Sequence, residues 1–112
     1  MRILSLYCGA GGIDEGLRQA GLSTTLAIDQ DWDCCDTMQA NHPHVEVVRS
    51  TVADMEDSLG HFDMVVGGPP CQDFSSANTQ RTMNPVEVDR FWRIVRKTKA
   101  TYAIMENIRN HL

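Results

Sequence analysis

The sequence predicts a single α/β domain built on a mostly parallel sheet. Short apolar segments rich in β-branched or aromatic residues alternate with stretches of helical periodicity along the 112 residues. This alternation is typical of parallel strands joined by right-handed crossovers. The length suits one hydrophobic core and is too short for two domains, and no internal repeat or low-complexity linker divides it.

Five segments are predicted to form strands, because each is short, apolar and partly β-branched or aromatic. They cover residues 2–7, 23–28, 45–49, 64–66 and 102–105. In a parallel sheet the fourth and fifth strands can be neighbours, which would bring the residues that follow them to the same edge. Ligands of such sheets bind at the carboxyl ends of the strands, so those ends are where functional residues are expected.

Three helices are expected between the strands, over residues 13–20, 32–40 and 86–97. The first is followed by Gly21, a plausible C-terminal cap, and the second stops before Pro43. The third carries an apolar stripe, which predicts that one face of it packs on the sheet. That stripe consists of Phe91, Ile94 and Val95.

Composition indicates a folded, water-soluble protein. At 42% hydrophobic and 22% charged residues, the chain resembles average globular proteins and not disordered or low-complexity ones. The longest apolar run, near Met64, is ended by two glycines and two prolines before it could span a membrane. Glycines from Gly9 onward also interrupt any signal-peptide core. We therefore expect a cytoplasmic protein, or a nucleoid-associated one in a prokaryote.

The four cysteines show no C-x-x-C pair, and the four histidines form no spaced set with them, so no metal site is expected. In the absence of secretion features, free thiols in a reducing compartment are favoured over disulfides.

Charge is unevenly distributed along the chain. Residues 1–70 carry three arginines and eleven acidic residues, a net charge of −8, whereas residues 71–112 carry seven basic and four acidic residues, a net charge of +3. A polyanion should therefore meet the second part of the chain. The alternative is an ordinary solvated helix face.

A glycine-rich turn follows the first predicted strand. After Tyr7, the glycines Gly9, Gly11 and Gly12 let the backbone turn tightly and approach a ligand, and the next helix offers free N–H groups. The turn suits a nucleotide-like cofactor, although a turn that serves only packing fits the same residues.

An acidic residue follows the second strand. Asp29 lies 18 positions after Gly11, about where a carboxylate would accept hydrogen bonds from ribose hydroxyls. Helix capping is the alternative, and it is the preferred interpretation for Asp31. The many carboxylates here favour a cofactor with a ribose and a positive charge over a phosphate-rich dinucleotide. After the third strand, Asp54 and Met55 could hold an adenine ring by a polar contact and an apolar face.

The fourth strand runs into Gly67-Gly68-Pro69-Pro70-Cys71. Two glycines and two prolines fix a stiff turn that presents the cysteine where nucleophiles are commonly placed. A cysteine after a strand can also be a buried packing residue, but the Pro-Pro-Cys-Gln context favours the nucleophile.

Glu106 and Asn107 follow the fifth strand, and an acid beside a thiol suggests a nucleophile with a hydrogen-bonding partner. Their alternative role is capping of the next segment.

In this order the segments resemble the motifs of cytosine-5 DNA methyltransferases. Residues 7–12 are similar to the first motif, which usually starts with Phe, and Asp29 matches the ribose-binding acid, which is usually Glu. Asp54 and Met55 resemble the adenine-contacting pair. Residues 67–75 resemble the Gly-Pro-Pro-Cys-Gln-x-Phe-Ser nucleophile motif, and residues 105–108 the Glu-Asn-Val motif.

The resemblance implies a Rossmann-like S-adenosylmethionine-dependent methyltransferase fold, truncated after the fifth strand. It implies methyl transfer from S-adenosylmethionine to carbon 5 of a cytosine flipped out of double-stranded DNA, through a covalent cysteine adduct. The implied catalytic residues are Cys71, Glu106 and Asn107. The implied cofactor-binding residues are Tyr7, Gly9, Gly11, Gly12, Asp29, Asp54, Met55 and Pro70. Gln72, Ser75 and Arg81 would belong to a loop that closes over DNA.

The sequence also departs from the family pattern. The loop lacks the common Arg-Gly element, and the chain stops at Leu112, before the family's Arg-x-Arg motif, target-recognition region and final helix. Residues 1–112 are therefore expected to be a partial catalytic domain that is inactive alone. A split subunit that needs a C-terminal complementing chain, a truncated gene product and a fragment are the three explanations. A non-catalytic cofactor-binding or assembly module and an RNA cytosine-5 methyltransferase are the rival functions, and an exposed sheet edge makes self-association plausible.

Overall fold

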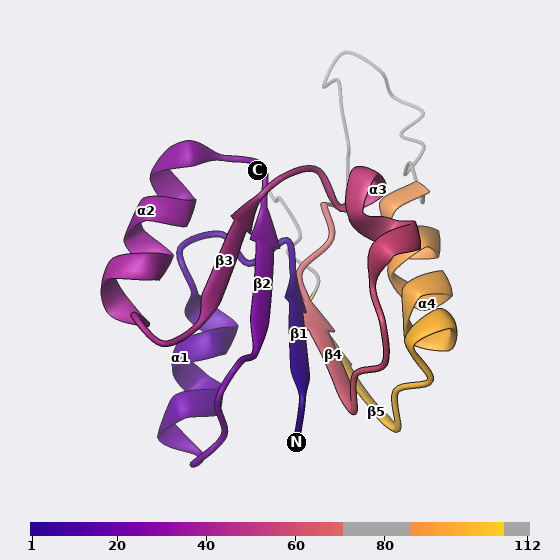
Figure 1. Cartoon of the computed structure of the whole chain (residues 1–112), viewed down its shortest axis with the longest axis horizontal. Helices are drawn as coiled ribbons and strands as arrows, with labels where there is room; N and C mark the ends of the chain where they lie inside the picture. The colour runs from indigo at the N-terminus through magenta and orange to yellow at the C-terminus, as the bar shows by residue number, and fades with distance from the viewer. Residues whose placement is uncertain (71–85, 107–112) are drawn as a thin grey trace, which may run out of the picture.

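The computed structural model describes residues 1–70 and 86–106, which form one α/β unit (Figure 1). All pairings in its five-stranded sheet are parallel, in the order β3-β2-β1-β4-β5. The predicted parallel sheet is thus confirmed, as is the pairing of the fourth and fifth strands. The strands are β1 (Ile3–Leu6), β2 (Leu26–Asp29), β3 (Glu46–Arg49), β4 (Met64–Gly67) and β5 (Tyr102–Met105).

Helices cover both faces of this sheet (Figure 1). One face packs against α1 (Gly12–Gln19) and α2 (Trp32–Asn41), and the other against α3 (Val52–Met55) and α4 (Val86–Thr98). The three predicted helices are confirmed to within a residue or two. The short helix α3 and the 3₁₀ turn η1 (Glu56–Ser58) were not predicted. Within the two described ranges, no helix has the length and apolar character needed to cross a bilayer.

Successive side chains of the buried strands point to opposite faces of the sheet, so the core has two layers. Leu4 and Leu6 point to the α4 side, where Phe91 and Ile94 are fully buried against them. Ile3 points to the opposite side and packs with the α1 layer. Each buried Phe or Ile side chain contributes about 1.5 to 3 kcal/mol through removal of apolar surface from water. Because both faces are covered, β1 and β4 consist largely of apolar residues instead of alternating with polar ones.

The helix termini follow the capping rules. The Asp31 side chain accepts hydrogen bonds from the backbone N–H groups of Asp33 and Cys34 at 2.8 and 3.1 Å, which confirms its predicted role as the N-cap of α2. After α1, Gly21 adopts φ +86°, and its N–H donates to the Arg18 carbonyl at 3.0 Å. This left-handed glycine is the predicted C-terminal cap.

A buried carboxylate anchors α4. Glu56, in η1, is only 7% exposed and pairs with Arg90, Arg93 and Lys97 along one side of the helix. The Arg93 hydrogen bond is the first cause that lowers the pKa of Glu56 to about 2. Three of the basic residues in the second part of the chain therefore neutralise a buried acid, a role that neither a polyanion surface nor a solvated helix face had predicted.

The strand order creates a switch point beside β1. From β1 the chain moves outward in one direction through β2 and β3, and then returns to place β4 and β5 on the other side. Loops at the carboxyl ends of β1, β2 and β4 consequently diverge and leave a crevice between them. At this edge Gly67 packs against β1 so closely that an added Cβ would lie 2.5 Å from the Leu6 carbonyl oxygen.

Candidate functional site

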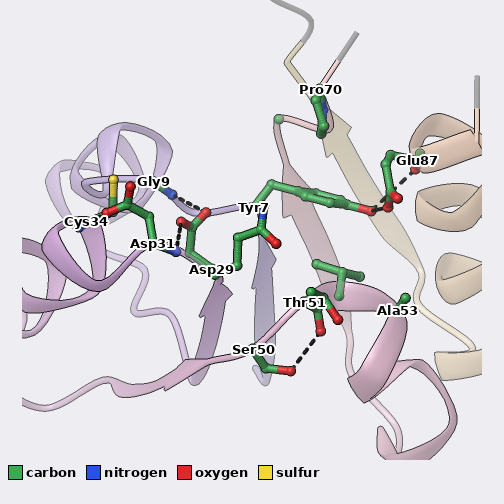
Figure 2. Close-up of a pocket in the computed structure, with 13 residues that line it drawn as sticks. Tyr7, Gly9, Asp29, Asp31, Cys34, Ser50, Thr51, Ala53, Pro70 and Glu87 are labelled. Carbon is green, nitrogen blue, oxygen red and sulfur yellow. Dashed lines mark hydrogen bonds between the residues drawn. The ribbon is translucent and has the colours of Figure 1, made fainter. Parts of the chain in front are cut away.

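A pocket of about 510 Å³ occupies this crevice (Figure 2). Its volume falls within the range of small-molecule sites. Each lining residue lies at or just after the carboxyl end of a strand, or in the first turn of α2, α3 or α4. The lining residues are Tyr7, Gly9, Asp29, Gln30, Asp31, Cys34, Ser50, Thr51, Val52, Ala53, Gly68, Pro70 and Glu87.

The glycine-rich turn forms one wall through strained backbone. Tyr7 and Gly9 adopt φ values of +55° and +56°, in the left-handed region that L side chains rarely enter. An added Cβ on Gly9 would meet nothing within 4 Å, so the glycine is required by conformation and not by crowding. Gly11 has φ +100°, and there a Cβ would also lie 2.7 Å from the Met38 sulfur. Gly11 and Gly12 border a separate hollow next to α1 and do not line the pocket.

Asp29 links this turn to the end of β2. Its Oδ1 accepts a hydrogen bond from the Gly9 N–H at 3.3 Å, and its Oδ2 accepts one from the Asp31 N–H at 3.1 Å. Each oxygen retains a second lone pair, so the carboxylate can still accept from a ligand hydroxyl. The structure thus brings Tyr7, Gly9, Asp29 and Pro70 from the predicted set into one pocket.

The wall after β3 differs from the sequence prediction. Thr51, Val52 and Ala53 line the pocket, whereas Asp54 and Met55 are not among the described residues that do so. Met55 instead packs against the hydrophobic core on the α4 side. The reason is local: only two residues separate α3 from the end of β3, so the first two residues of α3 meet the crevice while the last two lie further round its single turn. The adenine contact assigned to this pair stays a prediction.

Tyr7 crosses the crevice to the opposite wall. Its hydroxyl donates a hydrogen bond to Glu87 Oε1 at 2.6 Å (Figure 2). Arg90 Nε donates to the same oxygen at 3.1 Å. Burial, followed by the Glu87 hydrogen bond and charge, raises the pKa of Tyr7, so the phenol stays protonated and acts as the donor.

Glu106 lies at the same edge beside the end of β4. Its N–H donates to the Gly67 carbonyl at 2.8 Å, and its Oε1 lies 3.8 Å from where a Cβ on Gly68 would be. Pro70, which immediately precedes Cys71, lines the pocket. The other predicted catalytic and DNA-binding residues lie outside the described ranges. These are Cys71, Gln72, Ser75, Arg81 and Asn107.

The described cysteines are free thiols held in the protonated form. Burial, and then the charge of Asp14, raises the pKa of the Cys8 thiol. The pKa values of Cys34 and Cys35 are also raised, first by burial and then by nearby acids. A thiolate, not a thiol, is the effective nucleophile, so these three positions are unsuited to nucleophilic chemistry.

Comparison with known proteins identifies the family. The profile of the C-5 cytosine-specific DNA methylases matches residues 1–112. The chain belongs to this family. It is 34% identical to the Type II methyltransferase M.AquIA of Picosynechococcus over 96% of its own length and 48% of that protein. It is also 33% identical to the Type II methyltransferase M.DdeI of Desulfomicrobium norvegicum, over 96% and 28% of the two chains. The chain thus spans about half, or less, of these relatives.

Solved structures confirm the fold of this methylase family member. A crystal structure assigned as a DNA modification methyltransferase encoded within an E. coli prophage superimposes with a TM-score of 0.76 at 24% identity. The superposition covers 96% of this chain and 32% of that one. The predicted Rossmann-like methyltransferase fold is therefore confirmed.

Family and fold together support S-adenosylmethionine as the cofactor, and the residues of the pocket fit it. Asp29 offers acceptors for ribose hydroxyls, while Val52 and Ala53 offer apolar surface for a purine. Asp29, Asp31 and Glu87 also give the pocket a negative potential, which favours a cofactor that carries positive charge.

Several lining residues were missed by the sequence analysis. Thr51 and Val52 could have been found, because Thr51 is an N-cap residue two positions after a predicted strand, and its side chain accepts a hydrogen bond from the Asp54 N–H at 3.1 Å. Glu87 could not, because the contact that brings it to the pocket joins residues 80 positions apart.

Proposed function

We propose that this chain forms the cofactor-binding and nucleophile-bearing part of a DNA cytosine-5 methyltransferase. The observation that carries the proposal is the pocket at the β1 switch point. It joins the glycine turn and Asp29, on one side, to Pro70 of the Gly-Pro-Pro-Cys segment, on the other. The residue expected to react with cytosine follows Pro70 directly in the sequence.

The pocket residues would position the cofactor. Asp29 would bind the ribose, and the glycine turn would let the backbone approach the amino-acid portion without a Cβ in the way. The bound cofactor supplies an activated methyl group on a positively charged sulfur. Pro70 would hold that end of the pocket next to the reacting base.

Cys71 and Glu106 would carry the chemistry on the base. The target cytosine leaves the duplex stack, at a cost of a few kcal/mol. The Cys71 thiolate adds to carbon 6, while Glu106 hydrogen-bonds to ring nitrogen 3 and the exocyclic amine, so that carbon 5 becomes nucleophilic. Carbon 5 takes the methyl group, its proton is then lost to a base, and the carbon–sulfur bond breaks to release Cys71. Asn107 would orient neighbouring groups, and Gln72, Ser75 and Arg81 would contact DNA.

The full reaction is proposed to need a second part, because the chain spans half or less of its Type II methyltransferase relatives. That part would supply target recognition and most contacts to double-stranded DNA. Such an enzyme would serve a restriction-modification system, as Type II methyltransferases do.

Cofactor binding tests the first half of the proposal. Calorimetry should detect S-adenosylhomocysteine binding to the chain, and Asp29→Ala should weaken it by about tenfold or more, because charge-assisted hydrogen bonds are lost. Asp33→Ala is the matched control, since Asp33 is exposed in the first turn of helix α2 and does not line the pocket. Equal affinity of wild type and Asp29→Ala would contradict the proposed cofactor site.

Methyl transfer tests the second half. The chain should be mixed with the C-terminal region of M.AquIA and assayed for transfer of a labelled methyl group to DNA. Activity is expected only in the mixture, and Cys71→Ser should abolish it. Activity that survives Cys71→Ser would refute the nucleophile assignment, and transfer to RNA in preference to DNA would refute the substrate.

A further inference from the structure

A carboxylate from α4 enters the pocket at a position that no sequence motif predicted. Glu87 lies in the first turn of the helix, with 33% of its side chain exposed, and lines the cavity. The Tyr7 hydroxyl and Arg90 Nε donate hydrogen bonds to its Oε1 at 2.6 and 3.1 Å. Arg90 Nη1 in turn donates to Oε1 of the buried Glu56 at 3.2 Å. Three elements therefore fix the direction of this side chain.

Among the described residues, both hydrogen bonds from other side chains to the Glu87 carboxylate use Oε1. Oε2 is thus the oxygen left to meet a ligand. An ionised carboxylate has no proton to donate, so it can only accept hydrogen bonds. It therefore favours a ligand group that donates and disfavours a carbonyl oxygen.

The position of Glu87 indicates which part of the cofactor it would meet. Figure 2 shows Asp29 and Asp31 at one end of the pocket and Glu87 at the other, with the Tyr7 ring extending between them. A nucleoside with its ribose at Asp29 would extend its base along the Tyr7 ring and the apolar surface of Val52 and Ala53. The exocyclic amine of adenine is the donor that this base presents on its outer edge.

We propose that Glu87 accepts a hydrogen bond from the exocyclic amine of the cofactor's adenine, and that it thereby determines selectivity for adenine over 6-oxopurines. This inference rests on the proposed function, because it assumes a nucleoside cofactor in the pocket. It replaces the polar contact expected of Asp54, which is not among the described residues that line the cavity.

The test compares two ligands that differ at the proposed contact. Calorimetry on the whole chain measures the affinity for S-adenosylhomocysteine and for S-inosylhomocysteine, in which a carbonyl replaces the amine. Wild type should prefer the adenine ligand by at least about tenfold, since an acceptor that the bound ligand covers with a carbonyl is left unsatisfied. In Glu87→Gln the amide can donate to the carbonyl, so the preference should fall by at least about tenfold.

Two variants serve as checks. Asp89→Asn removes a charge from the same first turn of α4 at an exposed position outside the pocket, and should retain the wild-type preference. Tyr7→Phe keeps the ring and removes the hydroxyl that donates to Glu87, so it should lower the preference for the adenine ligand. This variant provides the test if Glu87→Gln folds poorly.

The outcomes separate this inference from the proposed function. If both ligands bind wild type equally well, or if Glu87→Gln and Tyr7→Phe keep its preference, the assignment of Glu87 is wrong while the cofactor site stands. If neither ligand binds wild type, both the assignment and the proposed function fail.

Discussion

At the scale of single residues, Glu56 and Gly67 hold the frame on which the pocket is built. Glu56 binds three cations of α4, and through Arg90 it supports the Glu87 carboxylate in the pocket. Gly67 lets β4 approach β1 closely at the edge where the crevice opens. Neither residue touches the ligand space directly, so substitutions here should act first on stability.

Glu56→Gln should lower the free energy of unfolding by about 2 kcal/mol, because hydrogen bonds to a charged group become neutral ones and three cations lose their counter-charge. Chemical denaturation at pH 7 measures the change. Asp57→Asn is the control, since Asp57 is 92% exposed and pairs only with Lys97 among the described residues. It should change stability by no more than about 0.5 kcal/mol. Equal effects of the two substitutions would contradict a special role for Glu56.

The same carboxylate predicts a dependence on pH. The pKa of Glu56 is about 2 in the folded protein against an ordinary 4.5, so its ionised form favours folding. Its contribution is present above about pH 4.5 and is lost as the pH falls toward 2. Denaturation of wild type and Glu56→Gln should therefore give a stability difference that narrows from pH 5 to pH 3. A constant difference across that interval would refute the assignment.

Gly67→Ala should destabilise the chain by about 3 kcal/mol, because the new methyl group would collide with backbone that cannot move aside. Gly60→Ala is the matched control, since an added Cβ there meets nothing within 4 Å. Thermal melts of both variants measure the effect. Similar melting temperatures for both variants would show that β4 can shift away from β1.

At the scale of elements, the strands and long helices were predictable because their apolar periodicity is local. Strand boundaries differ slightly from the prediction: β2 starts at Leu26 instead of residue 23, where its paired register with β1 and β3 begins, and it includes Asp29, which pairs with Arg49 of β3. The helix α3 was missed because its four residues are too few to show a period. The wall made by Thr51 and Val52, and the contact of Tyr7 with Glu87, depend on tertiary packing.

The two edges of the sheet differ in a way that predicts self-association. On β3, the exposed Glu46 and Arg49 place charge at the edge, which discourages pairing with another chain. On β5, Tyr102 and Ile104 are 54% and 47% exposed, on the sheet face that carries α1. An apolar edge of this kind favours contact with a second copy.

Sedimentation should therefore detect dimers or larger species of the 112-residue chain, and Ile104→Lys should shift the population toward monomer. Trp32→Lys is the control, because Trp32 is 64% exposed and lies over Arg49 near the opposite edge. A monomeric wild type would contradict this prediction, as would an equal effect of the two substitutions.

At the scale of the whole molecule, the order of the strands explains why residues distant in sequence share one site. The switch beside β1 opens the crevice, the acidic first part of the chain supplies Asp29 and Asp31, and α4 supplies Glu87. Strand β5 brings Glu106 next to the end of β4. The motif order made the family and the pocket predictable. The position of Glu87 in the pocket could be found only from the tertiary structure.

The central claim is that Cys71 attacks the cytosine ring at the edge of this pocket. The most direct measurement uses DNA that contains 5-fluorocytosine, with the chain, its complementing region and S-adenosylmethionine. Fluorine cannot leave as a proton does, so the reaction should stop at a covalent adduct. Mass spectrometry of the digested adduct should find the methylated base on the peptide that contains Cys71. A modified base on Cys8, Cys34 or Cys35, or methyl transfer to ordinary DNA without any trapped adduct, would contradict the claim.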